Sequence, residues 1–180
     1  MKTKAFLLFF LFCLGASTLI YGQDMNVMTY NIKFDNPDDE NDSWDRRKVL
    51  ILEQLLFYEP AVFGIQEGMH HQVQYLDESL PGYDYAGVGR DDGQTGGEYS
   101  AVYYNHSLFT LLKDHTFWLS ETPREPSVGW DAAMERICTC VLLRHKKSGE
   151  HFWVFNPHFD HVGEQARRNS ARLILDKIHE

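Results

Sequence analysis

The stretch Asn156-Pro157-His158-Phe159-Asp160-His161 follows the apolar run Phe152-Trp153-Val154-Phe155 near the end of this chain. Four large apolar residues in succession predict a strand that a sheet shelters on both faces. Pro157 predicts the end of that strand, because proline brings no N–H group to a ladder of hydrogen bonds. The strand would therefore deliver a carboxamide, two imidazoles and a carboxylate at its end, where catalytic groups are commonly displayed. Histidines alone also suit a polar surface loop, so the upstream sequence has to decide.

The N-terminal half of the chain has the pattern of a β-α-β unit. Residues 26–34 have the β-branched and aromatic composition of a strand. A helix is expected between Ser43, a candidate N-cap, and Pro60. Its apolar face would be formed by Val49, Leu52, Leu55 and Leu56. The apolar run 61–65 predicts a second strand that is parallel to the first, and hence an α/β fold.

The C-terminal half predicts more strands and two more helices. We expect strands at 83–88, 98–104, 110–119, 136–143 and 151–156, and the last two would form a hairpin. Helices are expected at 69–79 and 163–180. The second helix would have an apolar side formed by Ala166, Ala171, Leu173, Ile174 and Ile178. The acidic loop 35–42 does not have the spacing of an EF-hand, which favours a solvated loop over a calcium site.

The first residues resemble a targeting segment. Lys2 and Lys4 precede an apolar run that is shorter than a membrane-spanning helix, so we interpret residues 1–22 as a cleaved signal peptide. This predicts export to the periplasm or the extracellular space, with no stable membrane span after processing. Residues 25–180 then have the length of one domain, which we expect to be a monomer.

Charge and cysteine content restrict the functions that fit this chain. Its formal net charge is −9, and loss of Lys2 and Lys4 would make it −11. An acidic surface repels polyphosphate backbones, so non-specific binding of nucleic acid is disfavoured. Cys138 and Cys140 lie two residues apart on one expected strand, where a disulfide would be strained and zinc spacing is poor. We interpret both as small packing residues.

Three polar side chains stand beside the predicted strands. Glu67 follows the run 61–65 directly, where a carboxylate suits a hard metal ion and suits a helix cap equally well. Asn31 lies near the end of the first strand. Glu98 stands at the start of the strand expected at 98–104.

Four segments together resemble the endonuclease/exonuclease/phosphatase superfamily of metal-dependent phosphoesterases. They are Met28-Thr29-Tyr30-Asn31-Ile32, Gly64-Ile65-Gln66-Glu67, Glu98-Tyr99-Ser100-Ala101-Val102-Tyr103-Tyr104 and Asn156-Pro157-His158-Phe159-Asp160-His161. Two further segments, 116–120 and 129–131, look like a secreted bacterial branch of that family. The resemblance implies an α/β sandwich of two sheets with helices on the outer faces, of which residues 25–180 form the N-terminal part.

The resemblance also implies roles for five residues. Glu67 and Asn31 match the family's ligands for Mg²⁺, which Mn²⁺ could replace. His158 matches the histidine that contacts the scissile phosphate or protonates the leaving group. Glu98 resembles the glutamate that supports this histidine, and it would orient the ring and favour its protonated form, so that His158 could donate a proton near neutral pH. Asn156 matches an amide that contacts the phosphate. The implied function is that of a secreted, Mg²⁺-dependent hydrolase of phosphodiesters or phosphomonoesters.

The sequence departs from the family in two respects. Pro157 replaces the more usual threonine, which concerns the shape of the loop more than the role of His158. The Gly-Asp-x-Asn and Ser-Asp-His stretches that follow in the family do not occur here. We therefore expect a truncated product, with little hydrolysis by these 180 residues alone, because the base that activates water would be missing.

Two other functions remain open at this point. One is a non-catalytic binding domain derived from the family, which the missing motifs favour. The other is a zinc site that uses His70, His71, His158 and His161. Adjacent His70 and His71 would point in different directions on a helix, which argues against their binding one ion.

Overall fold

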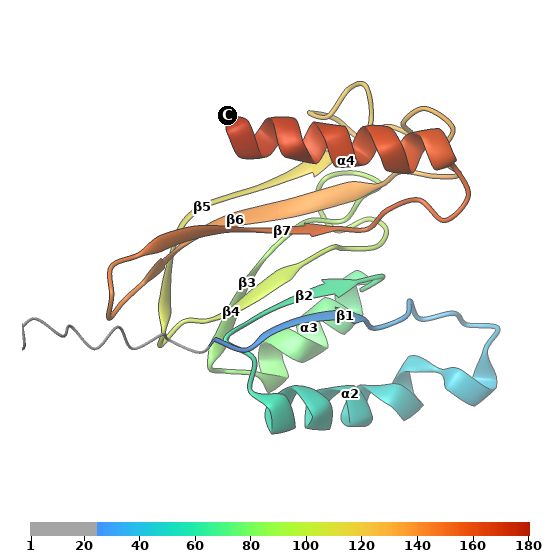
Figure 1. Cartoon of the computed structure of the whole chain (residues 1–180). Coiled ribbons are helices and arrows are strands. Elements are labelled where there is room, and N and C mark those ends of the chain that lie inside the picture. Colours follow the sequence, from blue (N-terminus) through green and yellow to red (C-terminus); the bar gives the residue numbers. More distant parts are fainter. Residues whose placement is uncertain (1–24) are drawn as a thin grey trace, which may run out of the picture.

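The computed structural model describes residues 25–180. These residues form two stacked β-sheets with helices on their outer faces (Figure 1). The elements are β1 (Val27–Asn31), the short 3₁₀ helix η1 (Glu40–Asp42), α2 (Trp44–Tyr58), β2 (Val62–Gln66), α3 (His70–Ser79), β3 (Tyr83–Ala86), β4 (Val102–Asn105), β5 (Phe109–Trp118), β6 (Ile137–His145), β7 (His151–Pro157) and α4 (Glu164–His179). The predicted sandwich is confirmed. The predicted signal peptide, residues 1–22, lies outside the described residues.

The first sheet has the strand order β1-β2-β4-β3. β1 and β2 are parallel and are joined through α2, so the predicted β-α-β unit is confirmed. In their register Asn31 is opposite Gln66. Both strands therefore end at the same edge of the sheet, and Glu67 follows there directly. β4 is antiparallel to both β2 and β3.

The second sheet has the order β5-β6-β7 and is antiparallel throughout. β6 and β7 form the predicted hairpin. β7 packs over β2, and β6 packs over β4. Apolar side chains fill the space between the sheets: Val62, Ala86, Val102, Tyr104, Phe109, Val141 and Leu143. Because β7 lies over β2, β1 projects beyond the second sheet, and Val27 on β1 is 59% exposed.

The apolar run of β7 is less buried than its sequence predicts. Trp153 is 47% exposed, whereas Phe152 and Val154 pack against the core between the sheets. The prediction of a strand sheltered on both faces is wrong, because the face of β7 that carries Trp153 is left partly uncovered. Pro157 is the last residue of β7, as predicted.

Helices α2 and α3 cover the outer face of the first sheet (Figure 1). The buried residues of α2 are Trp44, Ile51 and Leu55. The predicted apolar face was partly wrong, because Val49 and Leu56 are exposed. The Ser43 side chain makes no capping hydrogen bond. Instead, the backbone N–H of Trp44 donates to Oδ1 of Asp35, at 3.2 Å.

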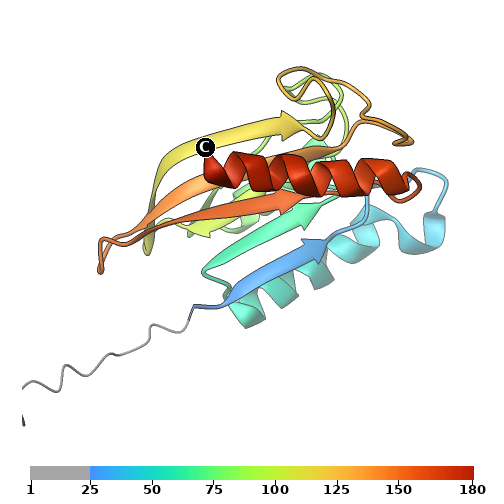
Figure 2. The same ribbon diagram turned by 45° about the horizontal axis from the view of Figure 1, so that its top comes forward.

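Helix α4 lies across the second sheet (Figure 2). Its buried residues are Ala166, Ser170 and Ile174, whereas Ala171 and Ile178 are exposed, contrary to prediction. Ile174 packs on Phe117, Leu119, Cys138 and Cys140. Both cysteines are buried and free, as predicted for packing residues. No helix within residues 25–180 is long and apolar enough to span a membrane.

The strand predicted at 98–104 begins later, at Val102. Tyr99 forms isolated bridges to Gly68 and Gly89 instead of continuing β4. The chain before β4 thus closes against the segment that follows β2. This brings Glu98 towards the edge of the sheet that carries Glu67.

Candidate active site

The structure brings Asn31, Glu67 and His158 together at one edge of the sandwich. Asn31 is the last residue of β1, Glu67 follows β2, and His158 follows β7. Nδ2 of Asn31 donates to Oε1 of Glu67 at 2.7 Å. Nε2 of His158 lies 3.8 Å from the same carboxylate oxygen. Three strand ends therefore place an amide, a carboxylate and an imidazole around one point.

Glu67 adopts a backbone conformation that is unusual for a residue with a side chain. Its φ is 63°, in the left-handed region. Its carboxylate is held by Asn31, and Oε2 accepts a hydrogen bond from the backbone N–H of Phe34 at 3.3 Å. A strained backbone that is fixed by its neighbours is typical of functional positions.

The oxygens of Glu67 and Asn31 fit a hard cation that needs few protein ligands. Oδ1 of Asn31 accepts one hydrogen bond, from the backbone N–H of Lys33 at 2.9 Å, and a carbonyl oxygen retains a second lone pair. Mg²⁺ keeps several waters and binds through one or two carboxylates, so this pair of side chains suits it.

The four histidines considered for a zinc site are not arranged around a common point. Among residues 25–180 there is no group of three or more His, Cys, Asp or Glu side chains arranged to hold a metal ion. The ring of His70 contacts the hydroxyl of Tyr99, and the ring of His71 contacts Asp35. The structure therefore does not support the zinc alternative with His158 and His161.

His158 is not poised as the sequence suggested. Burial, together with the nearby positive charge of Arg136, lowers the pKa of His158 to about 4, although Glu67 opposes the shift. The expectation of a ring that is protonated near neutral pH is therefore wrong for this structure. The backbone N–H of His158 donates to the carbonyl of Ile137 at 3.1 Å, which fixes the start of the loop.

Glu98 interacts more closely with Arg90 than with His158. Its carboxylate accepts hydrogen bonds from Nη1 and Nη2 of Arg90 at 2.8 and 3.1 Å. Oε2 lies 3.7 Å from Nδ1 of His158, beyond hydrogen-bond distance. Burial raises the pKa of Glu98, and the Arg90 charge opposes this. Glu98 belongs to the cluster, but the idea that it keeps His158 protonated is not supported.

Asn156 is engaged between the two sheets and does not present its amide to the site. It is 5% exposed. Nδ2 donates to the carbonyls of Ile65 and Ala101 at 2.8 and 3.0 Å, and Oδ1 accepts from Nε2 of Gln66 at 2.6 Å. Gly64 permits this approach, because a Cβ there would lie 2.6 Å from the Asn156 amide. The predicted phosphate contact by Asn156 is therefore corrected to a link between the sheets.

Replacing Asn156 by Ala is expected to destabilise the fold. Two buried carbonyls and the Gln66 amide would lose their partner, and each unsatisfied buried group costs about 1–3 kcal/mol, so we expect about 2–4 kcal/mol in total. Urea unfolding followed by fluorescence measures the change. Asn41→Ala is the matched control, because Asn41 is exposed on η1. Equal unfolding midpoints for the two variants would contradict this role.

Sequence reasoning missed the pairing of Arg136 with Asp160, which form a buried ion pair beside the site. Nε of Arg136 lies 3.1 Å from Oδ2 of Asp160. Asp160 also accepts hydrogen bonds from the backbone N–H groups of Ala133, Val162 and Gly163. Burial opposes its ionisation, but these donors and Arg136 hold its pKa well below the usual range. The sequence signalled only an arginine at the start of the strand expected at 136–143, without indicating its partner.

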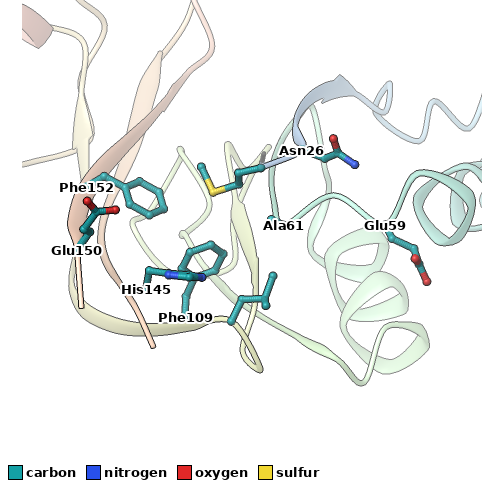
Figure 3. A pocket seen from close by; sticks show the side chains of 9 residues that line it. Asn26, Glu59, Ala61, Phe109, His145, Glu150 and Phe152 are labelled. Atoms are coloured by element: carbon teal, nitrogen blue, oxygen red, sulfur yellow. The ribbon is translucent and has the colours of Figure 1, made fainter. Parts of the chain in front are cut away.

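The site residues border a shallow cavity of about 250 Å³. It is lined by Phe34, Glu67, Glu98, Met134, Arg136, His158 and His161. A second cavity, of about 370 Å³, lies at the opposite end of the strands, beside Asn26, Phe109, His145 and Phe152 (Figure 3). None of the residues that line this second cavity belongs to the cluster around Glu67.

Solved structures show where this fold and site belong. No protein-family model matches the chain. An endonuclease/exonuclease/phosphatase protein from Bacteroides vulgatus is 44% identical with a TM-score of 0.85, and the match covers 87% of this chain and 60% of that protein. This chain belongs to the endonuclease/exonuclease/phosphatase superfamily. A mannosyl-6-phosphatase from Bacteroides thetaiotaomicron is 42% identical with a TM-score of 0.84, over 86% of this chain and 59% of that one.

Two further proteins are more distantly similar to this chain. An uncharacterized protein of Acanthamoeba polyphaga mimivirus is 29% identical over 143 residues, which are 74% of this chain and 53% of that protein. The catalytic domain of human Nocturnin is 21% identical with a TM-score of 0.66, over 86% of this chain and 59% of that one, which shows the fold alone. The chain thus spans little more than half the length of these relatives.

Proposed function

We propose that this chain contributes the site at Asn31, Glu67 and His158 to a Mg²⁺-dependent phosphoesterase. The observation that carries the proposal is the meeting of these three side chains at the ends of β1, β2 and β7. Mn²⁺ would be expected to substitute for Mg²⁺. We also propose export through the segment 1–22, which N-terminal sequencing of the exported protein would test.

Each side chain has a distinct part in the proposed reaction. Glu67 and Asn31 would hold Mg²⁺ through their oxygens. When bound, Mg²⁺ supplies positive charge that stabilises the negative charge on the phosphoryl oxygens in the transition state. His158 presents Nε2 on the side that faces Glu67 and would bond to an oxygen of the same phosphate. Glu98 and Arg136 lie near Nδ1, on the other side of the His158 ring.

We propose a small phosphate ester as the substrate, in preference to long nucleic acid. The net charge of −9 disfavours a polyphosphate backbone. The mannosyl-6-phosphatase from Bacteroides thetaiotaomicron is 42% identical to this chain. Phe34 and Met134 give the cavity an apolar wall that could contact the body of a sugar. Sugar phosphomonoesters are therefore the first candidates.

A panel of phosphate esters tests the proposal. Among the esters of the panel, any Mg²⁺-dependent release of phosphate should be faster from mannose 6-phosphate or a related phosphomonoester than from a nitrophenyl phosphodiester or single-stranded DNA. His158→Gln should lower the rate by about 100-fold, within the range expected for an acid–base or hydrogen-bonding group. His151→Gln is the control, because His151 is exposed at the start of β7. Preferred cleavage of DNA would overturn the substrate class.

A non-catalytic binding domain is the second candidate. The same panel separates the two functions when inorganic phosphate binding is followed by NMR in parallel. Binding of phosphate near His158 without hydrolysis of any ester would support the second candidate. Hydrolysis that Glu67→Gln abolishes would exclude it.

A further inference from the structure

Arg136 stands at the centre of the polar groups beside the site. Its side chain is 5% exposed at the start of β6. Nε donates to Asp160, Nη1 lies 3.4 Å from Nδ1 of His158, and Nη2 lies 2.8 Å from Nδ1 of His161. One planar guanidinium therefore contacts a carboxylate and two imidazoles at once. Asp160 supplies the countercharge that a buried guanidinium requires.

The chemistry of these contacts determines which ring nitrogens carry protons. A guanidinium has five N–H donors and no acceptor. Each Nδ1 that faces Arg136 must therefore present a lone pair. In a neutral imidazole the proton is then on Nε2. The contact with His161 is short, and the longer contact with His158 acts in the same direction.

Glu98 is the one neighbour that would favour the opposite arrangement at His158. Its Oε2 lies 3.7 Å from Nδ1 and would attract a proton there. That distance exceeds the 3.4 Å to Nη1 of Arg136, and the same carboxylate already accepts two hydrogen bonds from Arg90. The nearer partner of Nδ1 is therefore a donor.

We propose that Arg136 is a positioning residue that holds both His158 and His161 as their Nε2–H tautomers. In His158 this directs an N–H group towards Glu67 and, on the proposed function, towards an oxygen of the bound phosphate. A neutral ring can donate this hydrogen bond, so His158 does not need to be an imidazolium to contact the phosphate. His161 receives the same orientation at the rim of the cavity.

The tautomers can be measured directly by NMR on the full chain labelled with ¹⁵N-histidine, without metal or ester. Long-range ¹H–¹⁵N spectra at neutral pH distinguish protonated from unprotonated ring nitrogens. Spectra of His158→Gln and His161→Gln assign the two signals. We expect a proton on Nε2 and none on Nδ1 in both rings. A proton on Nδ1 of His158, whether alone or in an imidazolium, would overturn the proposal.

Two variants identify the residue that sets the tautomer. Glu98→Gln should leave both rings as Nε2–H, because Arg136 remains in place. Arg136→Lys keeps the charge beside Asp160 but removes the fork of donors, so a population of Nδ1–H tautomer should appear, first in His161. A shift of His158 in Glu98→Gln, or unchanged rings in folded Arg136→Lys, would contradict the assignment. If Arg136→Lys fails to fold, the wild-type and Glu98→Gln spectra still decide.

Different experiments test the role of Arg136 and the proposed function. The tautomers are read without any reaction, so an inactive chain with Nε2–H rings would leave the role of Arg136 intact. An active chain with Nδ1–H in His158 would refute the role of Arg136 and leave the phosphoesterase proposal standing.

Discussion

Glu67→Gln is expected to weaken Mg²⁺ binding by roughly 100-fold, which corresponds to about 2.8 kcal/mol at 1.4 kcal/mol per tenfold change. Glu67 supplies the one carboxylate of the proposed ligand pair, and a neutral amide replaces its charge with a much weaker dipole. The loss should appear equally in any Mg²⁺-dependent hydrolysis. The hydrogen bond from Asn31 can persist, because the new side chain keeps a carbonyl oxygen.

Binding can be followed by isothermal titration with Mg²⁺ and by the NMR line broadening that Mn²⁺ causes. Mn²⁺ should broaden the side-chain amide of Asn31 and the ring of His158 in the wild type. Glu78→Gln removes the same charge from the exposed face of α3 and should change neither measurement. Unchanged Mg²⁺ affinity in Glu67→Gln would remove the metal assignment.

Asp160→Asn should destabilise the fold by about 3–5 kcal/mol at neutral pH, the usual cost of removing one partner from a buried ion pair. The substitution leaves the Arg136 guanidinium buried without its countercharge. It also weakens the hydrogen bonds that Val162 and Gly163 donate at the start of α4. Guanidinium unfolding curves measure the difference. Asp38→Asn, on an exposed loop, is the matched control and should cost less than about 0.5 kcal/mol.

The contribution of Asp160 to the free energy of unfolding should also depend on pH in a defined direction. Its folded-state pKa is depressed, so its ionisation stabilises the fold above the ordinary aspartate pKa of about 3.9. That contribution disappears as the pH falls below 3.9 towards the lower folded-state value. The stability difference between wild type and Asp160→Asn should therefore shrink below about pH 4. A difference that stays constant down to pH 2 would contradict the assignment.

The placement of Asn31, Glu67 and His158 could be predicted because each follows a strand with a clear sequence pattern. Parallel β1 and β2 necessarily end at one edge, so Asn31 and Glu67 come together from topology alone. The helices were located well, but the buried face of α2 was not. Trp44 and Ile51 face the core only because of how α2 rests on β2 and α3.

The finer chemistry of the site could not be obtained from spacing. The family resemblance implied that Asn156 contacts the phosphate, yet the packing of β7 on β2 turns its amide inward. Arg136 and Asp160 lie far apart in sequence, and nothing in either segment indicates their pairing. The lowered pKa of His158 likewise depends on Arg136 and on burial, which appear only when the chain is folded.

The amide of Asn156 has one more consequence for this architecture. It is bonded to Gln66, which directly precedes Glu67, and it stands two residues before His158. The distance between the side chains of Glu67 and His158 is thus set by buried hydrogen bonds between the two sheets, and not by the surface segments. Those segments, such as 35–43, 90–97 and 121–135, are then free to diverge and to admit different esters while the reacting groups keep their spacing.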